Sequence, residues 1–472
     1  MPLNSDSRQP DVRESAASPP PPRSLATGTV YAVLGTGCYH GCQLGVLVLL
    51  AKLTSPEIQG QYLLGIAIAM PVILLFGLEL RGALVADAGN QYSFGCYRAL
   101  RSAMVVPAGM VLAAVAIWQV FTEPRSAFVW ISVGVFATHL AWMHAEVNWG
   151  TFQRRERLDL FAAAYALRGV ALMLPYAALI GIVAWLARTG RVDETRLADA
   201  AGGAALLSAV GFLLVTWLFD RRKVIDPELW DLSRTRASVR TLALHTLPLG
   251  LVAVTINLCG SFPRWLFESG SVPDGKAQLG YFGSLAFITL AGNLIVLQAG
   301  NTAAHRLART YQQDFGAFWR LLARLCGLAL LVGAVVLVLA IFAGEWLLRT
   351  LYTPEYARFQ TEFLIIVAAQ LPALLTIIFG ITTTQMRLFW LQVPAQLITL
   401  ACTVIAALIL IPGSTPVLGA ALTIVVRSVA QFLLYTGCLA YGLAYRQQIL
   451  RSPRRGSTAP FPGDDLEPGA QA

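Results

Sequence analysis

Three arginines lie inside long apolar segments of this sequence: Arg81, Arg168 and Arg427. A charged side chain is costly in an apolar environment, so it usually faces a water-filled cavity or pairs with an opposite charge. An arginine guanidinium also holds a carboxylate or a phosphate group through two parallel hydrogen bonds. We therefore predict that these residues bind an anionic ligand. Snorkelling to a membrane interface for Arg168 and a structural ion pair for Arg427 are the alternatives.

A fourth arginine, Arg264, follows Pro263 at the end of an apolar segment. Proline lacks a backbone donor and commonly ends a helix, and the neighbouring aromatic residues Phe262 and Trp265 are typical of a membrane interface. Arg264 is therefore either an interfacial residue or the outer guard of a path for anions.

Acidic and histidine side chains suit a second kind of chemistry, the coupling of transport to protons, and the residues leave coupling to sodium or to the substrate gradient alone open as alternatives. Glu79 lies two residues before Arg81, a spacing that points the two side chains in different directions on a regular helix. His144 and Glu146 lie near the end of another apolar segment, where they either pack at the interface or titrate in a water-filled cavity. Their spacing lacks the i,i+4 histidine pair and the third ligand that zinc requires. We predict coupling roles for Glu79, Glu146 and His144, and no metal or cofactor.

The composition identifies the environment in which these residues act. The chain of 472 residues is 56% hydrophobic and 13% charged, with a mean hydropathy of +0.62. Soluble domains carry roughly a quarter charged residues, so the composition excludes a soluble protein. A window of about 19 residues finds apolar segments long enough to cross a membrane. They are residues 29–52, 61–85, 102–121, 127–149, 161–187, 198–219, 241–263, 279–303, 325–348, 361–384, 391–411 and 417–442. The predicted fold is therefore all-α, with about twelve transmembrane helices.

The basic residues predict the orientation of the chain in its membrane. Of the 35 Lys and Arg residues, 23 fall in the two tails and the even-numbered loops, nine in the odd-numbered loops and three in the apolar segments. The positive-inside rule therefore places both termini in the cytoplasm. The same distribution accounts for the net charge of +9 without a nucleic-acid partner. The seven cysteines lie almost all in apolar segments, so we expect no disulfide.

An internal repeat divides the chain into two halves. Gly-Gln-Tyr at 60–62 is matched by Gly-Tyr-Phe at 280–282, and Phe-Gly at 94–95 by Phe-Gly at 315–316. The offsets of 220 and 221 residues indicate a duplicated six-helix unit. Two such units predict two lobes related by a pseudo-two-fold axis along the membrane normal, with a cavity between them. The predicted parts are a disordered tail at 1–25, lobes at 26–219 and 241–445, a basic linker at 220–240 and a second disordered tail at 446–472.

Several of these segments together resemble the Wzx-type polysaccharide flippases of the multidrug/oligosaccharidyl-lipid/polysaccharide (MOP) exporter superfamily. The segments that carry the resemblance are residues 50–62, 78–81, 94–95, 279–286, 304–309 and 348–356. The resemblance covers about residues 26–445. It implies two six-helix lobes, alternating access, no enzymatic activity, and translocation of undecaprenyl-diphosphate-linked oligosaccharide across the bacterial inner membrane. Membrane lipids and a polysaccharide polymerase are the further partners that it suggests.

On this interpretation Arg168 and Arg427 hold the diphosphate, Arg81 and Arg264 lie nearer the outer mouth, and Glu79 couples transport. A multidrug exporter of the same superfamily is one alternative, and it would favour buried carboxylates for its cationic substrates. A membrane glycan polymerase or ligase is another, which needs a catalytic exterior loop. No outward loop reaches about twenty residues, and neither a Ser-His-Asp set nor a DxD-type acidic pair occurs near the outer face. The arginines favour the anionic substrate.

Overall fold

The computed structural model describes residues 25–446, apart from 88–91, 124, 194, 225–234, 269, 271, 387 and 414. The tails predicted at 1–25 and 446–472 lie almost entirely outside the described residues, as does most of the basic linker predicted at 220–240. Within the described part of the chain, every regular element is a helix. The predicted all-α fold is confirmed.

The first half of the chain forms six membrane-spanning segments. They are built from α1 (Leu25–Leu53), α2 (Pro56–Gly77), α3 (Leu80–Ala86), α4 (Phe94–Thr122), α5 (Ser126–Arg154), α6 (Leu158–Arg188), α7 (Arg196–Val215), the π-helical turn η1 (Thr216–Asp220) and α8 (Arg221–Lys223). Two of these spans are composite: α2 with α3 crosses once, and α7 continues through η1 and α8. The number of crossings in this half therefore equals the number of apolar segments predicted there from the sequence.

The second half has the same number of crossings. It consists of α9 (Thr235–Leu266), α10 (Gly275–Ile288), α11 (Leu290–Gln313), α12 (Phe315–Leu351), the 3-10 turn η3 (Pro354–Phe359), α13 (Gln360–Gln385), α14 (Phe389–Leu410) and α15 (Pro416–Ala444). In the described part of the chain, eleven segments are each long and apolar enough to cross a membrane, and the pair α10 and α11, bent by 43°, forms the twelfth crossing. At the bend, the Thr289 hydroxyl donates to the Ala286 carbonyl and accepts from Gln370, so side chains replace backbone hydrogen bonds of the helix.

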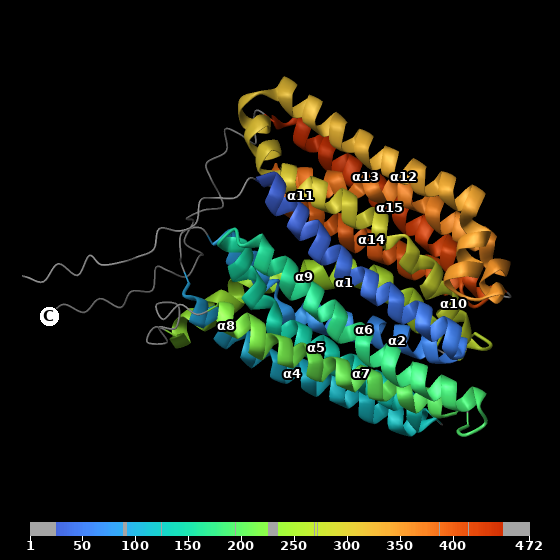
Figure 1. Cartoon of the computed structure of the whole chain (residues 1–472). Coiled ribbons are helices and arrows are strands. Elements are labelled where there is room, and N and C mark those ends of the chain that lie inside the picture. Colours follow the sequence, from blue (N-terminus) through green and yellow to red (C-terminus); the bar gives the residue numbers. More distant parts are fainter. Residues whose placement is uncertain are drawn as a thin grey trace, which may run out of the picture.

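The helices pack as two lobes. In the first half α1 packs along α6, and α7 packs against α5 and α6. In the second half α13 packs against α12 and α15, and α14 against α15. Figure 1 shows these as two layers, blue to green and yellow to red, with α1 running along their boundary. The main contacts between the halves are those of α2 with α9 and α10.

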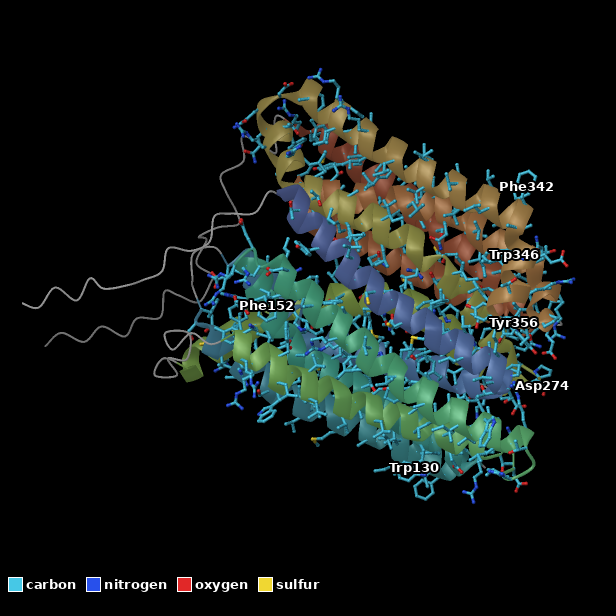
Figure 2. All side chains as sticks on the ribbon, viewed as in Figure 1. Trp130, Phe152, Asp274, Phe342, Trp346 and Tyr356 are labelled. Carbon is cyan, nitrogen blue, oxygen red and sulfur yellow. The ribbon has the colours of Figure 1, made fainter. Side chains whose placement is uncertain are left out.

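The two ends of the bundle are distinct, and we name them by the chain segments that they carry. The tail end carries the start of α1 and the end of α15, and the far end carries residues 54–55, 123, 125, 267–268, 272–274 and 352–353 between the helices. Figure 2 shows Trp130, Asp274 and Tyr356 toward the far end and Phe152 toward the tail end. Because the number of crossings is even, both ends of the described chain lie on one side of the bundle.

Two helices extend well beyond the apolar windows. Ser93 caps α4, with its hydroxyl accepting from the Cys96 amide, so this helix begins eight residues before the expected start at 102. The span that begins with α7 runs to Lys223, beyond the expected end at 219. As a result Arg101 and Asp220, which lie just outside the predicted apolar segments, belong to helices and are buried.

Candidate functional site

Two arginines lie close together in the second half. Arg264 belongs to α9 and Arg427 to α15, and each lies within electrostatic range of the other. Gly260, one helical turn before Arg264 on α9, faces Arg427, because a methyl group at Gly260 would lie 3.5 Å from Arg427 Nη1, in ordinary van der Waals contact. Among the described residues neither arginine has a hydrogen bond or an ion pair, and the buried Arg264 Nε has no partner. The pair therefore places two positive charges within electrostatic range of each other, with no acidic partner among the described residues.

Polar side chains surround this arginine pair. Gln431 lies one helical turn after Arg427 and donates to Gln396 of α14, with an Nε2–Oε1 distance of 3.2 Å. Gln396 in turn donates to the Cys259 sulfur of α9 at 3.5 Å, and the Ser261 hydroxyl donates to Asn257 on the same helix at 3.1 Å. Amides and hydroxyls of this kind both donate and accept, which suits a ligand rich in hydroxyl groups.

Gln396 and Gln431 were not among the predicted site residues, although the sequence holds a signal for glutamines on one face of α14. In α14 the polar residues Gln392, Gln396, Thr399 and Thr403 recur every three or four positions. This is the helical period, so they share one face of an otherwise apolar helix. A search for polar periodicity inside the apolar windows would have found them.

A second charged cluster lies in the first half, toward the tail end. Arg101 of α4 pairs with Glu146 of α5, with Nη2 and Oε2 3.2 Å apart, and its side chain is 1% exposed. Arg81 of α3 donates to the Tyr165 hydroxyl at 2.9 Å. Glu79 lies within electrostatic range of Glu146 and of both arginines. Two carboxylates and two guanidinium groups compensate one another, so this cluster is close to neutral when both acids are ionised.

A break in the second span positions Glu79. Leu78 and Glu79 have φ values of 52° and 49°, in the left-handed region that side chains rarely adopt, so α2 ends at Gly77 and α3 starts anew at Leu80. The expected divergence of Glu79 and Arg81 assumed a regular helix. With the helix broken, both side chains lie in the same cluster. Interrupted helices inside a membrane are tolerated where they are buried in protein or line a cavity.

Arg168 has partners of its own. Its Nη2 lies 2.6 Å from Asp220 Oδ2 and 2.7 Å from Thr216 Oγ1, and its Nη1 donates to the Ala164 carbonyl at 3.0 Å. The guanidinium carbon also lies 4.7 Å from the Trp149 ring centre, a cation–π contact. Arg168 therefore lies among first-half helices, whereas Arg427 lies against α9, so the structure does not bring these two predicted diphosphate ligands together. The substrate role predicted for Arg168 stays a prediction.

His144 lies on α5 near the charged cluster, within electrostatic range of Arg98 and Arg101. It lines a small cavity of about 250 Å³ together with Asn148 and Thr216. No group of three or more His, Cys, Asp or Glu side chains in the described parts of the chain is arranged to hold a metal ion.

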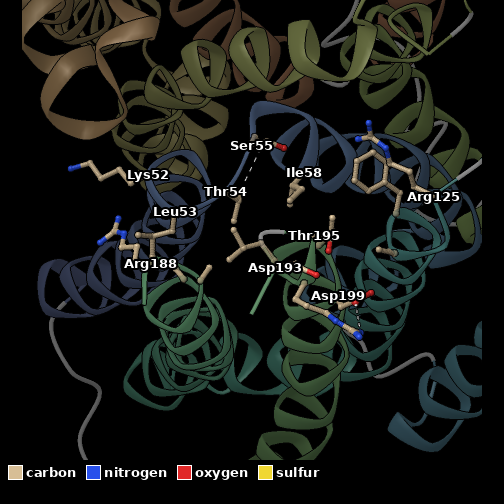
Figure 3. A pocket seen from close by; sticks show the side chains of 17 residues that line it. Lys52, Leu53, Thr54, Ser55, Ile58, Arg125, Arg188, Asp193, Thr195 and Asp199 are labelled. Carbon is tan, nitrogen blue, oxygen red and sulfur yellow. Dashed lines mark hydrogen bonds and ion pairs between the residues drawn. The ribbon is translucent and has the colours of Figure 1, made fainter. Parts of the chain in front are cut away.

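A larger cavity, of about 980 Å³, opens at the far end of the first half (Figure 3). The residues that line it include Lys52, Arg125, Arg188, Arg196, Asp193 and Asp199. Arg196 pairs with Asp199 at 3.3 Å, and Arg125 pairs with Glu57. This cavity lies between the ends of first-half helices, away from both the arginine pair of α9 and α15 and the cluster around Glu79.

No protein-family model matches the chain. The capsular polysaccharide biosynthesis protein CapF of Staphylococcus aureus is 22% identical over 406 residues, covering 84% of this chain and 94% of CapF. Three solved structures each match 90% of this chain. They are a MOP-superfamily transporter from Pyrococcus furiosus (TM-score 0.63, 15% identity, 96% of that chain), an outward-facing MATE-family multidrug transporter (0.61, 16%, 96%) and the lipid II flippase MurJ in an inward-closed conformation (0.59, 12%, 91%). The chain therefore has the two-lobe fold of the MOP-superfamily transporters.

Proposed function

We propose that this chain, which has the fold of the MOP-superfamily transporters, translocates undecaprenyl-diphosphate-linked oligosaccharide across the bacterial inner membrane by alternating access. The likeness to a capsular polysaccharide protein and to a lipid II flippase supports a membrane transporter of lipid-linked glycans. We place the tail end in the cytoplasm, as the distribution of Lys and Arg residues predicts. A polysaccharide polymerase that receives the product is the partner that fits this role.

The observation that carries the proposal is the uncompensated pair of Arg264 and Arg427. An unpaired charge inside a membrane protein is costly, so two of them within electrostatic range of each other favour a ligand that brings negative charge. A diphosphate supplies at least two negative charges and several acceptor oxygens. These oxygens can accept the paired N–H donors of two guanidinium groups. The amide of Gln431, which is half-buried one helical turn after Arg427, then lies where it can meet the sugars.

The cluster around Glu79 suits a different role. Because its two acids and two arginines compensate one another, it has little attraction for a further anion. Protonation of Glu79 or Glu146 would leave one positive charge in excess in the cluster. It would also weaken the electrostatic attraction between the acids and the guanidinium groups of Arg81 and Arg101. We therefore assign coupling to Glu79 and Glu146, with His144 beside them, and we assign Arg81 to this cluster rather than to the diphosphate. Asp220 neutralises the charge of Arg168. We therefore assign Arg168 a structural role in place of the diphosphate contact that the sequence predicts.

The experiment that tests this function follows the lipid-linked oligosaccharide in cells that lack the protein. A probe that cannot cross the inner membrane reports the leaflet in which the oligosaccharide accumulates. We expect accumulation on the cytoplasmic face, relieved by the wild-type chain. Arg349→Gln, an exposed far-end arginine that pairs with Glu345, is the matched control and should relieve it equally.

Two other outcomes would contradict the proposal. Normal export with altered sensitivity to cationic drugs would identify a multidrug exporter, although two adjacent uncompensated arginines repel a cation. Accumulation on the outer face would instead point to a polymerase or a ligase.

A further inference from the structure

The two glycines that define the internal repeat contact each other. A methyl group on Gly60 of α2 would overlap the Lys276 carbonyl oxygen and lie 3.2 Å from the Gly280 nitrogen of α10. A methyl group on Gly280 would overlap the Pro56 carbonyl oxygen and lie 3.3 Å from the Gly60 nitrogen. Lys276 precedes Gly280 by four residues, and Pro56 precedes Gly60 by four. The contact is therefore reciprocal, as expected where a pseudo-two-fold axis passes between two related helices.

Buried hydrogen bonds between the two halves surround this crossing. Gln59 of α2 donates to Ser284 Oγ of α10 at 2.7 Å and accepts from the Tyr356 hydroxyl, and neither Gln59 nor Ser284 is exposed. Within the second half, the Tyr352 hydroxyl donates to the Ser284 carbonyl at 3.1 Å and so supports the acceptor of Gln59. At the rim, Lys276 of α10 pairs with Glu123, which follows α4. The far end is thus joined across the halves by polar contacts at the point of closest backbone approach.

We propose that the crossing of Gly60 and Gly280 is the far-end seal of the transport cycle, which must separate before the cavity between the lobes can open toward that side. Two glycines let the backbones of α2 and α10 approach closely without side chains between them. The hydrogen bonds of Gln59 can exchange for bonds to water when the halves part, so opening exposes no large apolar surface. This inference deepens the proposed function and rests on its alternating access.

The experiment measures how accessible the seal is. Leu279, which precedes Gly280 and is fully buried, is replaced by cysteine in a chain whose seven native cysteines are removed. A maleimide that cannot cross membranes is applied to vesicles of both orientations. We expect slow labelling of Leu279→Cys alone. Gly60→Ala or Gly280→Ala should speed labelling from the far-end side by about tenfold, because the closed crossing has no room for a methyl group.

Matched controls are available in other membrane helices. Gly41 of α1 and Gly437 of α15 have no atom within 4 Å of an added methyl group, so Gly41→Ala and Gly437→Ala should leave the labelling rate unchanged. If the glycine variants of the seal do not fold, Ser284→Ala gives a milder test. It removes one acceptor of Gln59 and should raise labelling severalfold, whereas Ser208→Ala, at a buried serine within the first half, should not.

A folded Gly60→Ala or Ser284→Ala chain that labels at the control rate would overturn the seal. The readout needs no substrate, so it also separates this inference from the proposed function. If the variants label fast but the wild-type chain transports no oligosaccharide, the seal is supported and the proposed substrate is wrong. If the wild-type chain transports oligosaccharide but the variants label at the control rate, the substrate is supported and the seal is wrong.

Discussion

Arg168 and Asp220 form an ion pair in which neither side chain has exposed surface, with Nη2 and Oδ2 2.6 Å apart. The π-helical turn η1 faces both Thr216 and Asp220 toward α6, so the two residues bind the same guanidinium nitrogen. Such turns insert an extra residue into a helix and re-aim its side chains. The pair therefore joins the last span of the first half to α6.

The first prediction concerns the stability of this pair. Arg168→Gln and Asp220→Asn should each lower the free energy of unfolding by about 3–5 kcal/mol, because each leaves an uncompensated buried charge. The double variant should cost less than the sum of the two single variants, as expected for groups in direct contact. Thermal unfolding of the purified protein in detergent measures this. If Arg168→Gln retained full stability but abolished transport, Arg168 would be a substrate ligand after all.

The second prediction concerns coupling. Glu79→Gln keeps the size of the side chain but cannot exchange a proton, so transport should no longer respond to an imposed pH gradient. The measurement is the rate of oligosaccharide translocation into proteoliposomes with and without the gradient. Glu345→Gln, at an exposed far-end acid, is the control and should respond like the wild type. A gradient response that persists in Glu79→Gln would remove this residue from the coupling mechanism.

A third prediction separates recognition of the sugar from recognition of the diphosphate. Gln431→Leu removes an amide beside the arginine pair and should slow the transport of an oligosaccharide-bearing lipid by about fivefold, the effect of one lost hydrogen bond. Undecaprenyl diphosphate without sugar should bind the variant as it binds the wild type. Thr436→Val is the control on the same helix, because the Thr436 hydroxyl bonds only its own helix. Equal losses for both ligands would place Gln431 outside the sugar site.

The twelve crossings and the repeat could be predicted because both leave strong local signals. Long apolar windows exceed the thickness of a bilayer, and the glycines of the repeat turned out to mark the point where the lobes cross. Arg101 and Asp220 could not be found in this way. An apolarity window ends where charges begin, whereas a helix ends where its backbone is capped, so charged residues at helix ends are misplaced in loops.

The pairing of charges could not be predicted either, because it depends on contacts between distant segments. Arg168 and Arg427 look alike in the sequence, each an arginine inside an apolar segment. Only the fold gives Arg168 an acidic partner 52 residues away and leaves Arg427 beside Arg264. The break at Leu78 and Glu79 is likewise set by tertiary contacts, since neither residue type favours a positive φ.

The most direct test of the arginine pair uses purified protein in proteoliposomes loaded with undecaprenyl-diphosphate-linked oligosaccharide. The measured quantity is the rate at which the oligosaccharide becomes accessible in the opposite leaflet. The wild-type chain and Arg349→Gln should translocate it, and the Arg264→Gln/Arg427→Gln variant should not, although it remains folded. Translocation at the wild-type rate by this double variant would contradict the claim that the pair holds the diphosphate.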